Sequence, residues 1–347
     1  MSRDLEAELT RLGQLTDGCI RQVLTETMSE PAARFASMLE YHLGWRAPDL
    51  SPLDVPAPSG KKLRPALVLL VCSAVCGDEA RALAPAAAVE LIHNFSLVHD
   101  DIQDRSPLRR HRPTFWSLWG AEQGINAGDA LFALAQIAML RDPSERSARM
   151  VAELNRTALL LAEGQYLDIE LQAGGTAATP EAYAAMITRK TGVLFACACR
   201  LGAIAAGAAK DVEEAYAAYG LELGLAFQEQ DDLLGVWGRA AETGKPDALD
   251  VLERKRGLPA AIALSRADTP AWLTAAYDDR EGDRPMPPEL VNRVIDYFDR
   301  IQVRDEVERR VESRYRRALD CLEVARPREP AQSLLAALCE ALVARRA

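Results

Sequence analysis

The sequence has few aromatic residues and no apolar run long enough to cross a membrane. Aromatic side chains make up 6% of its 347 residues, whereas 49% are hydrophobic, and alanine and leucine dominate. The most apolar stretches are residues 66–75 and 193–209; the first is too short for a bilayer, and Arg200 interrupts the second. Because alanine and leucine are strong helix formers, this composition favours helices over sheets.

The sequence also lacks a net positive charge and a regular spacing of its cysteines. The formal net charge is −10, which argues against binding nucleic acid through its phosphate backbone. The seven cysteines have no regular spacing, so they indicate neither a disulfide framework nor a zinc site, and reduced thiols account for them. Residues 1–15 are acidic and amphipathic, unlike a signal peptide. We therefore expect a cytoplasmic protein with no transmembrane segment and no nucleic-acid partner.

Helical periodicity runs through nearly the whole chain. No convincing two-residue alternation marks a strand, and no repeat of fixed period is present. The predicted helices cover residues 3–27, 31–45, 62–76, 79–104, 121–140, 143–172, 180–208, 211–235, 250–266, 287–301, 303–326 and 330–345. We expect one all-α domain over residues 1–347, with helices often longer than the globular average.

Charged residues are densest in the stretch 91–114, LIHNFSLVHDDIQDRSPLRRHRPT. Asp100 and Asp104 lie about 40° apart around a helix and share a face, while Asp101 lies about 100° from Asp100. Such carboxylates repel unless a cation lies between them, and Mg²⁺ combines one or two carboxylates with water and phosphate oxygens. Arginines that suit a diphosphate follow at once: Arg105, Arg109, Arg110 and Arg112. The alternative is a solvated acidic helix end followed by a charged loop.

A second acidic pair, Asp231 and Asp232 in FQEQDDLLGVWG, ends another long helix. Two acidic pairs that end separate helices suit a metal site inside a helix bundle. Basic residues recur beside glycine, proline or acidic residues: Lys61, Lys62, Arg64, Lys190, Lys245 and Lys255. Each alone is most simply a solvent-exposed side chain, but together they favour a common anion site.

Several spaced motifs together resemble the trans-isoprenyl diphosphate synthase family, also called polyprenyl synthetases, from about residue 60 to 260. GKKLRP is similar to the family's GGKRLRP, the stretch ending in SLVHDD to its first aspartate-rich helix, and LRRHRPT to its paired-arginine loop. GDALFALA, EGQYLDI and KTGVLF are similar to its middle motifs, and FQEQDDLLGVWG with TGKP to its second aspartate-rich region. The resemblance implies the isoprenoid synthase fold, a large antiparallel helix bundle around a deep central cavity, paired as a homodimer.

The resemblance also implies a magnesium-dependent prenyltransferase that joins isopentenyl diphosphate to dimethylallyl, geranyl or farnesyl diphosphate. Three magnesium ions are expected at Asp100, Asp104 and Asp231, supported by Asp101 and Asp232. The residues expected to contact the allylic diphosphate are Arg109, Lys190 and Lys245, and the two lysines complete the catalytic set with Asp100, Asp104 and Asp231. Those expected to hold isopentenyl diphosphate are Lys61, Arg64, His93 and Arg110. Thr191 and Gln228 are expected near the reacting carbons.

One motif departs from the family's pattern, because Gly235 stands where most members have the last aspartate of the second motif. Gly235→Asp would restore that motif and is expected to be tolerated. Two alternatives stay open: a terpene cyclase of the same fold, or a non-catalytic subunit of a heteromeric prenyl synthase. The residues expected to hold isopentenyl diphosphate argue against the cyclase, and the intact first motif argues against the non-catalytic subunit.

Product length is expected to depend on the residues just before the first motif. Phe95 is the fifth residue before Asp100, and Ser96 is the fourth. In the family, an aromatic side chain at the fifth position looks like a floor that stops the growing prenyl tail. The predicted product is geranylgeranyl diphosphate, about C20, with farnesyl diphosphate (C15) next; the alternative is that Phe95 is an ordinary core residue.

Overall fold

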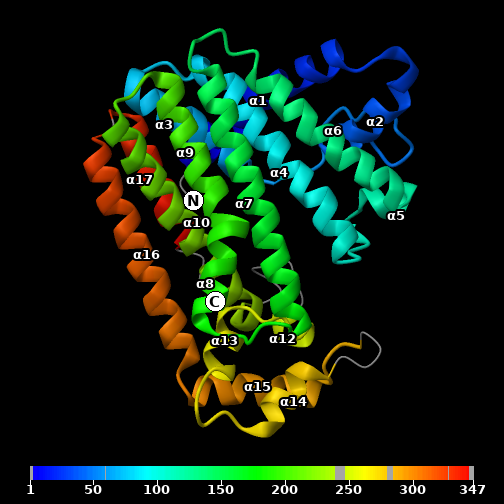
Figure 1. Ribbon diagram of the computed structural model, residues 1–347, viewed down its shortest axis with the longest axis vertical. Helices are drawn as coiled ribbons and strands as arrows, with labels where there is room; N and C mark the ends of the chain where they lie inside the picture. Colours follow the sequence, from blue (N-terminus) through cyan, green and yellow to red (C-terminus); the bar gives the residue numbers. More distant parts are fainter. Residues whose placement is uncertain (1–2, 59, 239–246, 280–283, 327, 344–347) are drawn as a thin grey trace. The chain divides into compact units, whose positions relative to one another are not determined.

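The computed structural model describes residues 3–58, 60–238, 247–279, 284–326 and 328–343. These residues form helices almost throughout, with one hairpin of two very short strands (Figure 1), so the prediction of an all-α protein is confirmed. The chain divides into two compact units. Unit 1 comprises Met1–Ala158, Cys197–Ala217 and Ala325–Leu335, and unit 2 comprises Leu159–Ala196, Ala218–Val324 and Ala336–Ala347. A single domain over residues 1–347 stays a prediction.

The elements of unit 1 are α1 (Arg3–Thr27), η1 (Glu30–Ala32), α2 (Ala33–His42), α3 (Leu63–Cys76), η2 (Glu79–Ala82), α4 (Leu83–Gln103), β1 (Leu108–Arg109), β2 (Arg112–Pro113), α5 (Phe115–Trp119) and α6 (Ala121–Met139). Those of unit 2 are α8 (Pro180–Ile187), the π-helical turn η3 (Thr188–Gly192), α12 (Leu249–Leu252), α13 (Leu258–Leu264), α14 (Ala271–Asp278), α15 (Pro288–Arg300) and α16 (Val303–Ala325, whose last residue belongs to unit 1). The chain passes from one unit to the other within α7 (Ser147–Ala173), α9 (Val193–Ala206), α10 (Lys210–Trp237) and α17 (Ala331–Val343).

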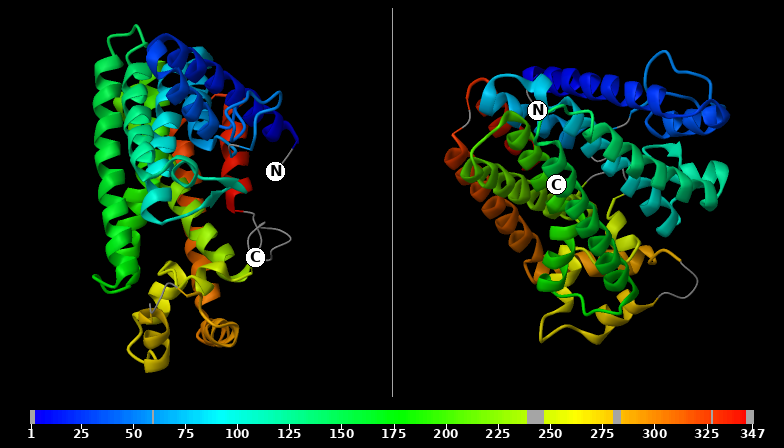
Figure 2. Two further views of the ribbon diagram at one scale, coloured as in Figure 1. Left: turned by 90° about the vertical axis from the view of Figure 1, so that its right-hand side faces the viewer. Right: turned by 45° about the horizontal axis from the view of Figure 1, so that its top comes forward.

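Helix α4 is central to unit 1, where it packs against α1, α3 and α6. It is apolar over most of its circumference until its last turn, which explains why it is buried on several sides. The views in Figures 1 and 2 show α4 and α6 side by side. No helix in the described part of the chain is apolar enough over a sufficient length to cross a membrane, and all seven cysteines are free thiols.

Two glycines let α4 and α6 approach closely. A Cβ atom at Gly128 would lie 2.0 Å from Nε2 of His99, and one at Gly124 would lie 2.7 Å from Cδ1 of Ile102. One turn farther along, the rings of Phe95 and Phe132 meet edge to face with centroids 5.4 Å apart. Because the residue numbers rise along α4 as they fall along α6, the two helices are antiparallel.

The basic segment after α4 contains strands that the sequence analysis did not expect. Leu108 pairs with Pro113 and Arg109 with Arg112 in an antiparallel hairpin. The two turn residues between the strands, Arg110 and His111, have φ values of 52° and 62°. Two-residue hairpin turns of type I′ require positive φ at both positions, because their twist matches that of the strands. The turn is therefore formed by charged residues rather than the usual glycine or asparagine.

The described residues of unit 2 form an apolar core. It joins α8, α10, α13, α14, α15 and α16, with Tyr183, Tyr277 and Phe298 among its largest buried side chains. Two of the predicted helices are divided in the structure. The helix expected over residues 180–208 is interrupted by η3, and the one expected over residues 250–266 is two short helices separated near Arg254, which has a φ of 54°. Helices α5 and α14 were not predicted, and most of the predicted loop 236–249 lies outside the described residues.

The π-helical turn lies directly against α7. A Cβ atom at Gly164 would be 2.3 Å from the backbone nitrogen of Lys190 and 2.7 Å from the carbonyl carbon of Arg189. Backbone atoms cannot move aside as a long side chain can, so this position requires glycine. Two predicted site residues, Lys190 and Thr191, lie within this π-helical turn, and π bulges are found frequently at functional sites.

We expect Gly164→Ala to destabilise the protein by about 1–3 kcal/mol, the usual cost of overpacking. The control is Gly18→Ala in α1, because a Cβ atom there would meet nothing within 4 Å. Alanine at that exposed helical position is expected to be neutral or stabilising by up to about 1 kcal/mol. Chemical denaturation of both variants measures the difference; equal stabilities would show that η3 can move away from α7.

Candidate active site

The first aspartate-rich motif forms the C-terminal end of α4. The chain turns away after the cap residue Asp104 at Arg105, whose φ is 51°, and the backbone nitrogen of Ser106 donates to the carbonyl of Asp101 at 2.9 Å. A left-handed residue followed by this bond is the usual way to satisfy the last carbonyls of a helix. Asp100 and Asp104 lie one helical turn apart. Asp100 is half-buried, and Asp104 is exposed at the cap position.

Asp101 differs from its neighbours because it is buried. Its Oδ1 accepts a hydrogen bond from Nε of Arg109 at 2.8 Å and forms an ion pair with Nη2 at 2.8 Å, so it ties the hairpin to the end of α4. Burial raises the pKa of Asp101, and the Arg109 guanidinium opposes that rise. Its Oδ2 is buried and accepts no hydrogen bond within the described residues.

The residues predicted to hold isopentenyl diphosphate include a contact pair in unit 1. Nη1 of Arg64 lies 3.4 Å from Nε2 of His93. Arg110 reaches Gly60, where an added Cβ would lie 2.6 Å from its Nη2 and where φ is +91°, so glycine is required at this position. Lys61 is exposed just before α3, whereas the neighbouring Lys62 pairs with Asp17 of α1.

Two histidines indicate the positive potential of this region. Burial and the charges of Arg64, Arg110 and Arg109 hold the pKa of His93 well below its ordinary value. Burial and the same hairpin arginines lower the pKa of His42 to about 3. Both imidazoles are therefore neutral at pH 7. Cationic side chains clustered in this way favour an anionic ligand, which would relieve their mutual repulsion.

The second aspartate-rich motif ends α10 in unit 2, and its two aspartates also differ. Asp231 is half-buried, while Asp232 is buried and accepts three hydrogen bonds. These come from Nε2 of Gln228 at 3.0 Å, from the backbone nitrogen of Leu258 at 2.9 Å and from Nζ of Lys255 at 3.4 Å. Asp232 therefore anchors α10 to the segment that begins α13.

The π-helical turn connects to this motif through Thr191, whose Oγ1 donates to Oε1 of Gln228 at 3.0 Å. Since Gln228 in turn donates to Asp232, the two residues predicted near the reacting carbons belong to one hydrogen-bonded chain. The preceding residue of the turn, Lys190, pairs through Nζ with Oδ2 of Asp168. Asp168 was not among the predicted site residues, although it lies in the quoted motif EGQYLDI. Lys245, by contrast, lies outside the described residues.

Comparison with known proteins identifies the fold and the family. The polyprenyl synthetase family model matches residues 51–294. The chain belongs to the polyprenyl synthetase family. It is similar to a geranylgeranyl diphosphate synthase of Mycobacterium tuberculosis, at 40% identity over 79% of this chain and 77% of that one. It is also similar to a (2E,6E)-farnesyl diphosphate synthase of the same species, at 38% identity over 75% and 73%.

A solved polyprenyl synthetase structure from Streptomyces coelicolor A3(2) superposes on the chain with a TM-score of 0.86 at 31% identity, covering 97% of this chain and 99% of that one. The isoprenoid synthase fold and the resemblance stated from the motifs are thereby confirmed. The family model extends the match beyond the predicted limits of about residues 60 and 260 at both ends.

The carboxylates of this family member are compatible with magnesium. Among the described residues, no three His, Cys, Asp or Glu side chains gather closely enough to hold a metal ion. Each motif nevertheless presents hard carboxylate oxygens at a helix end, and the buried Oδ2 of Asp101 lacks a hydrogen-bond partner among the described residues. Magnesium characteristically takes one or two such carboxylates and completes its octahedron with water and phosphate oxygens.

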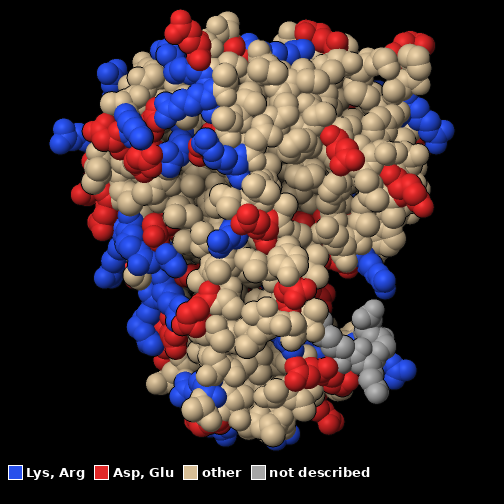
Figure 3. Space-filling view, viewed as in Figure 1, with Lys and Arg blue, Asp and Glu red and all other residues tan. Residues whose placement is uncertain are grey.

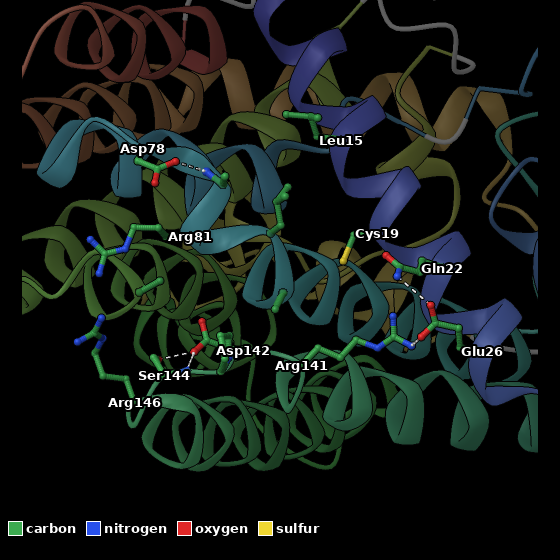
Figure 4. A pocket seen from close by; sticks show the side chains of 15 residues that line it. Leu15, Cys19, Gln22, Glu26, Asp78, Arg81, Arg141, Asp142, Ser144 and Arg146 are labelled. Carbon is green, nitrogen blue, oxygen red and sulfur yellow. Dashed lines mark hydrogen bonds and ion pairs between the residues drawn. The ribbon is translucent and has the colours of Figure 1, made fainter.

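A cavity of about 760 Å³ in unit 1 is lined by none of the motif residues. It lies among α1, η2, the start of α4 and the loop before α7 (Figure 4). Its arginines, Arg81, Arg141 and Arg146, are balanced by Glu26, Asp78 and Asp142, and Arg141 pairs with Glu26 at 2.6 Å. The lining carries no net charge and therefore favours neither sign of ligand.

Proposed function

We propose that the protein condenses isopentenyl diphosphate with an allylic diphosphate in the presence of magnesium and releases geranylgeranyl diphosphate, with farnesyl diphosphate as the next product. The protein is a short-chain trans-prenyltransferase, as the relatives named geranylgeranyl and farnesyl diphosphate synthases are. The observation that carries the proposal is the presence of an acidic helix end in each unit together with the basic Arg64–His93 region. The proposed reaction has two substrates, each with its own diphosphate. It therefore needs an acidic metal-binding site for one diphosphate and a basic site for the other.

In this proposal, Asp100, Asp104 and Asp231 would hold three magnesium ions, with Asp101 and Asp232 supporting them. The metal ions would supply charge stabilisation to the departing diphosphate. The burial of Asp101 and Asp232 suggests that their support is indirect: Asp101 holds Arg109, and Asp232 holds Gln228 and Lys255. Neighbouring aspartates thus have different tasks, one facing the ligand and one fixing the helix end.

The chain's own cations would act on the diphosphates. Arg109, Lys190 and Lys245 are proposed to contact the allylic diphosphate and to stabilise the negative charge that grows on it as the C–O bond ionises. Lys61, Arg64, His93 and Arg110 would hold isopentenyl diphosphate, whose double bond attacks the allylic cation. The proton lost afterwards would pass to the released diphosphate. Thr191 and Gln228, linked to each other, would present oxygen dipoles beside the cation.

The sequence left two alternatives open, a terpene cyclase and a non-catalytic subunit of a heteromeric prenyl synthase. A cyclase needs no second diphosphate site, so the arginines around the neutral His93 favour the synthase. A subunit without activity would be expected to lose its aspartates, and the first motif is whole. The deciding experiment incubates the purified protein with magnesium, labelled isopentenyl diphosphate and each allylic diphosphate in turn. Longer prenyl alcohols after dephosphorylation support the synthase; cyclic hydrocarbons or no product contradict it.

We also propose that the protein is a cytoplasmic homodimer. Apolar side chains are exposed on two helices, at Ile125 and Ile137 of α6 and at Leu159, Tyr166 and Ile169 of α7. Figure 3 shows few charged residues over the face formed by α6. Exposed apolar patches of this kind commonly mark interfaces between subunits. Light scattering of the purified protein, with Tyr166→Glu as the disrupting variant, tests the dimer.

Arg110→Ala is expected to raise the Michaelis constant for isopentenyl diphosphate by about tenfold or more, equivalent to about 1.4 kcal/mol, while changing that for the allylic substrate much less. The reason is that its guanidinium lies against Gly60 and its charge acts on both Arg64 and His93. Arg105→Ala removes an equal charge from the same exposed segment and serves as the control. Equal effects of Arg110→Ala on both substrates would contradict the assignment of Arg110 to one diphosphate.

A further inference from the structure

The glycine that replaces the last aspartate of the second motif is packed against another carboxylate. Gly235 lies one helical turn after Asp231, on the same face of α10. A Cβ atom at Gly235 would be 2.3 Å from Oδ2 and 2.4 Å from Cγ of Asp250. The carboxylate of Asp250 therefore lies within the space that a side chain at position 235 would occupy. The expectation that Gly235→Asp is tolerated has to be revised, because the new side chain would collide with Asp250.

The same pairing occurs in reverse a few residues away. A Cβ atom at Gly257 would lie 2.7 Å from Oδ2 of Asp232. Helix α10 thus contributes an aspartate and a glycine, Asp232 and Gly235, while the segment from α12 to the start of α13 contributes Asp250 and Gly257. Each aspartate fits against the glycine of the other segment. In this reciprocal arrangement, each carboxylate lies close to the backbone of the other segment. A side chain at either glycine would prevent that approach.

A single ammonium group joins the two carboxylates. Nζ of Lys255 lies 3.0 Å from Oδ2 of Asp250 and 3.4 Å from Oδ1 of Asp232. The side chains of these aspartates are 13% and 1% exposed, whereas that of Lys255 is 36% exposed, so the carboxylates are shielded from solvent and the ammonium group is partly so. Lys255 therefore bridges the two carboxylates.

We propose that Asp250 replaces the missing last aspartate of the second motif: it enters the space left by Gly235 and, through Lys255, fixes Asp232 and the end of α10 that carries Asp231. Asp250 is thus a positioning residue supplied by a different segment. The proposal rests on the proposed function only in treating Asp231 as a magnesium contact. The contacts among Gly235, Asp250 and Lys255 are independent of it.

The test is a double-mutant cycle at positions 235 and 250. Gly235→Asp alone is expected to weaken magnesium binding in the presence of inorganic diphosphate by at least about tenfold, because the new side chain displaces Asp250. Asp250→Ala alone is expected to have a similar effect, because Lys255 loses one carboxylate. The double variant Gly235→Asp/Asp250→Ala returns a carboxylate to the same place and should bind magnesium within about threefold of wild type. In a double-mutant cycle, such a departure from additivity shows that the two residues interact directly.

Calorimetry of magnesium binding and thermal unfolding without metal are the two readouts, and neither requires turnover. Asp250→Asn retains the shape of the side chain and removes its charge, so it should lower the unfolding temperature even if Gly235→Asp fails to fold. Asp268→Asn, in an exposed pair with Arg266, is the matched control and should change neither readout. Additive losses in the double variant, or an unchanged Asp250→Asn, would overturn the proposal. A failed prenyl-transfer assay with a rescued double variant would instead reject the proposed function alone.

Discussion

Asp231→Ala and Asp100→Ala are each expected to lower turnover by at least about a thousandfold while the protein stays folded. Both residues are half-buried at the ends of apolar helices, and their proposed role is to hold the charge that stabilises the departing diphosphate. Removal of one such preorganised electrostatic group typically costs about 10²–10³-fold, and loss of a metal contact adds to this. Steady-state turnover under saturating magnesium, together with circular dichroism, measures the effect.

The buried neighbour of Asp231, Asp232, is expected to behave differently when it is replaced. Asp232→Ala should lower thermal stability as well as turnover, because Gln228 and the backbone nitrogen of Leu258 lose this acceptor and Lys255 loses one of its two carboxylates. A buried donor left without a partner costs about 1–3 kcal/mol. If Asp231→Ala retained near wild-type turnover, or if it unfolded as readily as Asp232→Ala, the division between ligand-facing and structural aspartates would be wrong.

Phe95→Ala is expected to shift the product from about C20 to C25 or longer. A growing prenyl tail that runs along α4 from Asp100 would meet residue 95 a little over one turn away, and each turn advances about 5.4 Å, roughly one isoprene unit. Phe95 contacts Phe132 of α6 edge to face, so the two rings together would form the floor. Removing one ring opens space that the other does not fill.

Chromatography of dephosphorylated products under identical substrate ratios tests this floor. Phe132→Ala is the companion variant, because its ring lies across the same contact but belongs to α6. A shift with Phe95→Ala confirms the predicted position, and a shift with Phe132→Ala alone moves the floor to α6. An unchanged distribution in both well-folded variants would mean that the ring pair is ordinary packing between two helices.

The long helices were predictable from the sequence because their apolar residues recur with a helical period. The helix expected over residues 3–27 is α1, Arg3–Thr27, and the one expected over residues 62–76 is α3, Leu63–Cys76. The π-helical turn at Thr188–Gly192 could not be predicted in this way. One extra residue in a helix leaves no clear mark on periodicity, and the turn depends on the close approach of Gly164 in another helix.

The sequence by itself determined which residues could form the site, because carboxylates one turn apart at a helix end share a face in any helix. Tertiary structure alone decided the task of each one. Asp100 and Asp101 are adjacent, and only the hairpin that brings Arg109 to α4 makes Asp101 the buried member of the pair. Likewise, the sequence showed only that Gly235 in DDLLG stands where a carboxylate is usual. Folding places Asp250, fifteen residues later, in the vacant space, because a side chain's position depends on the path of the whole backbone.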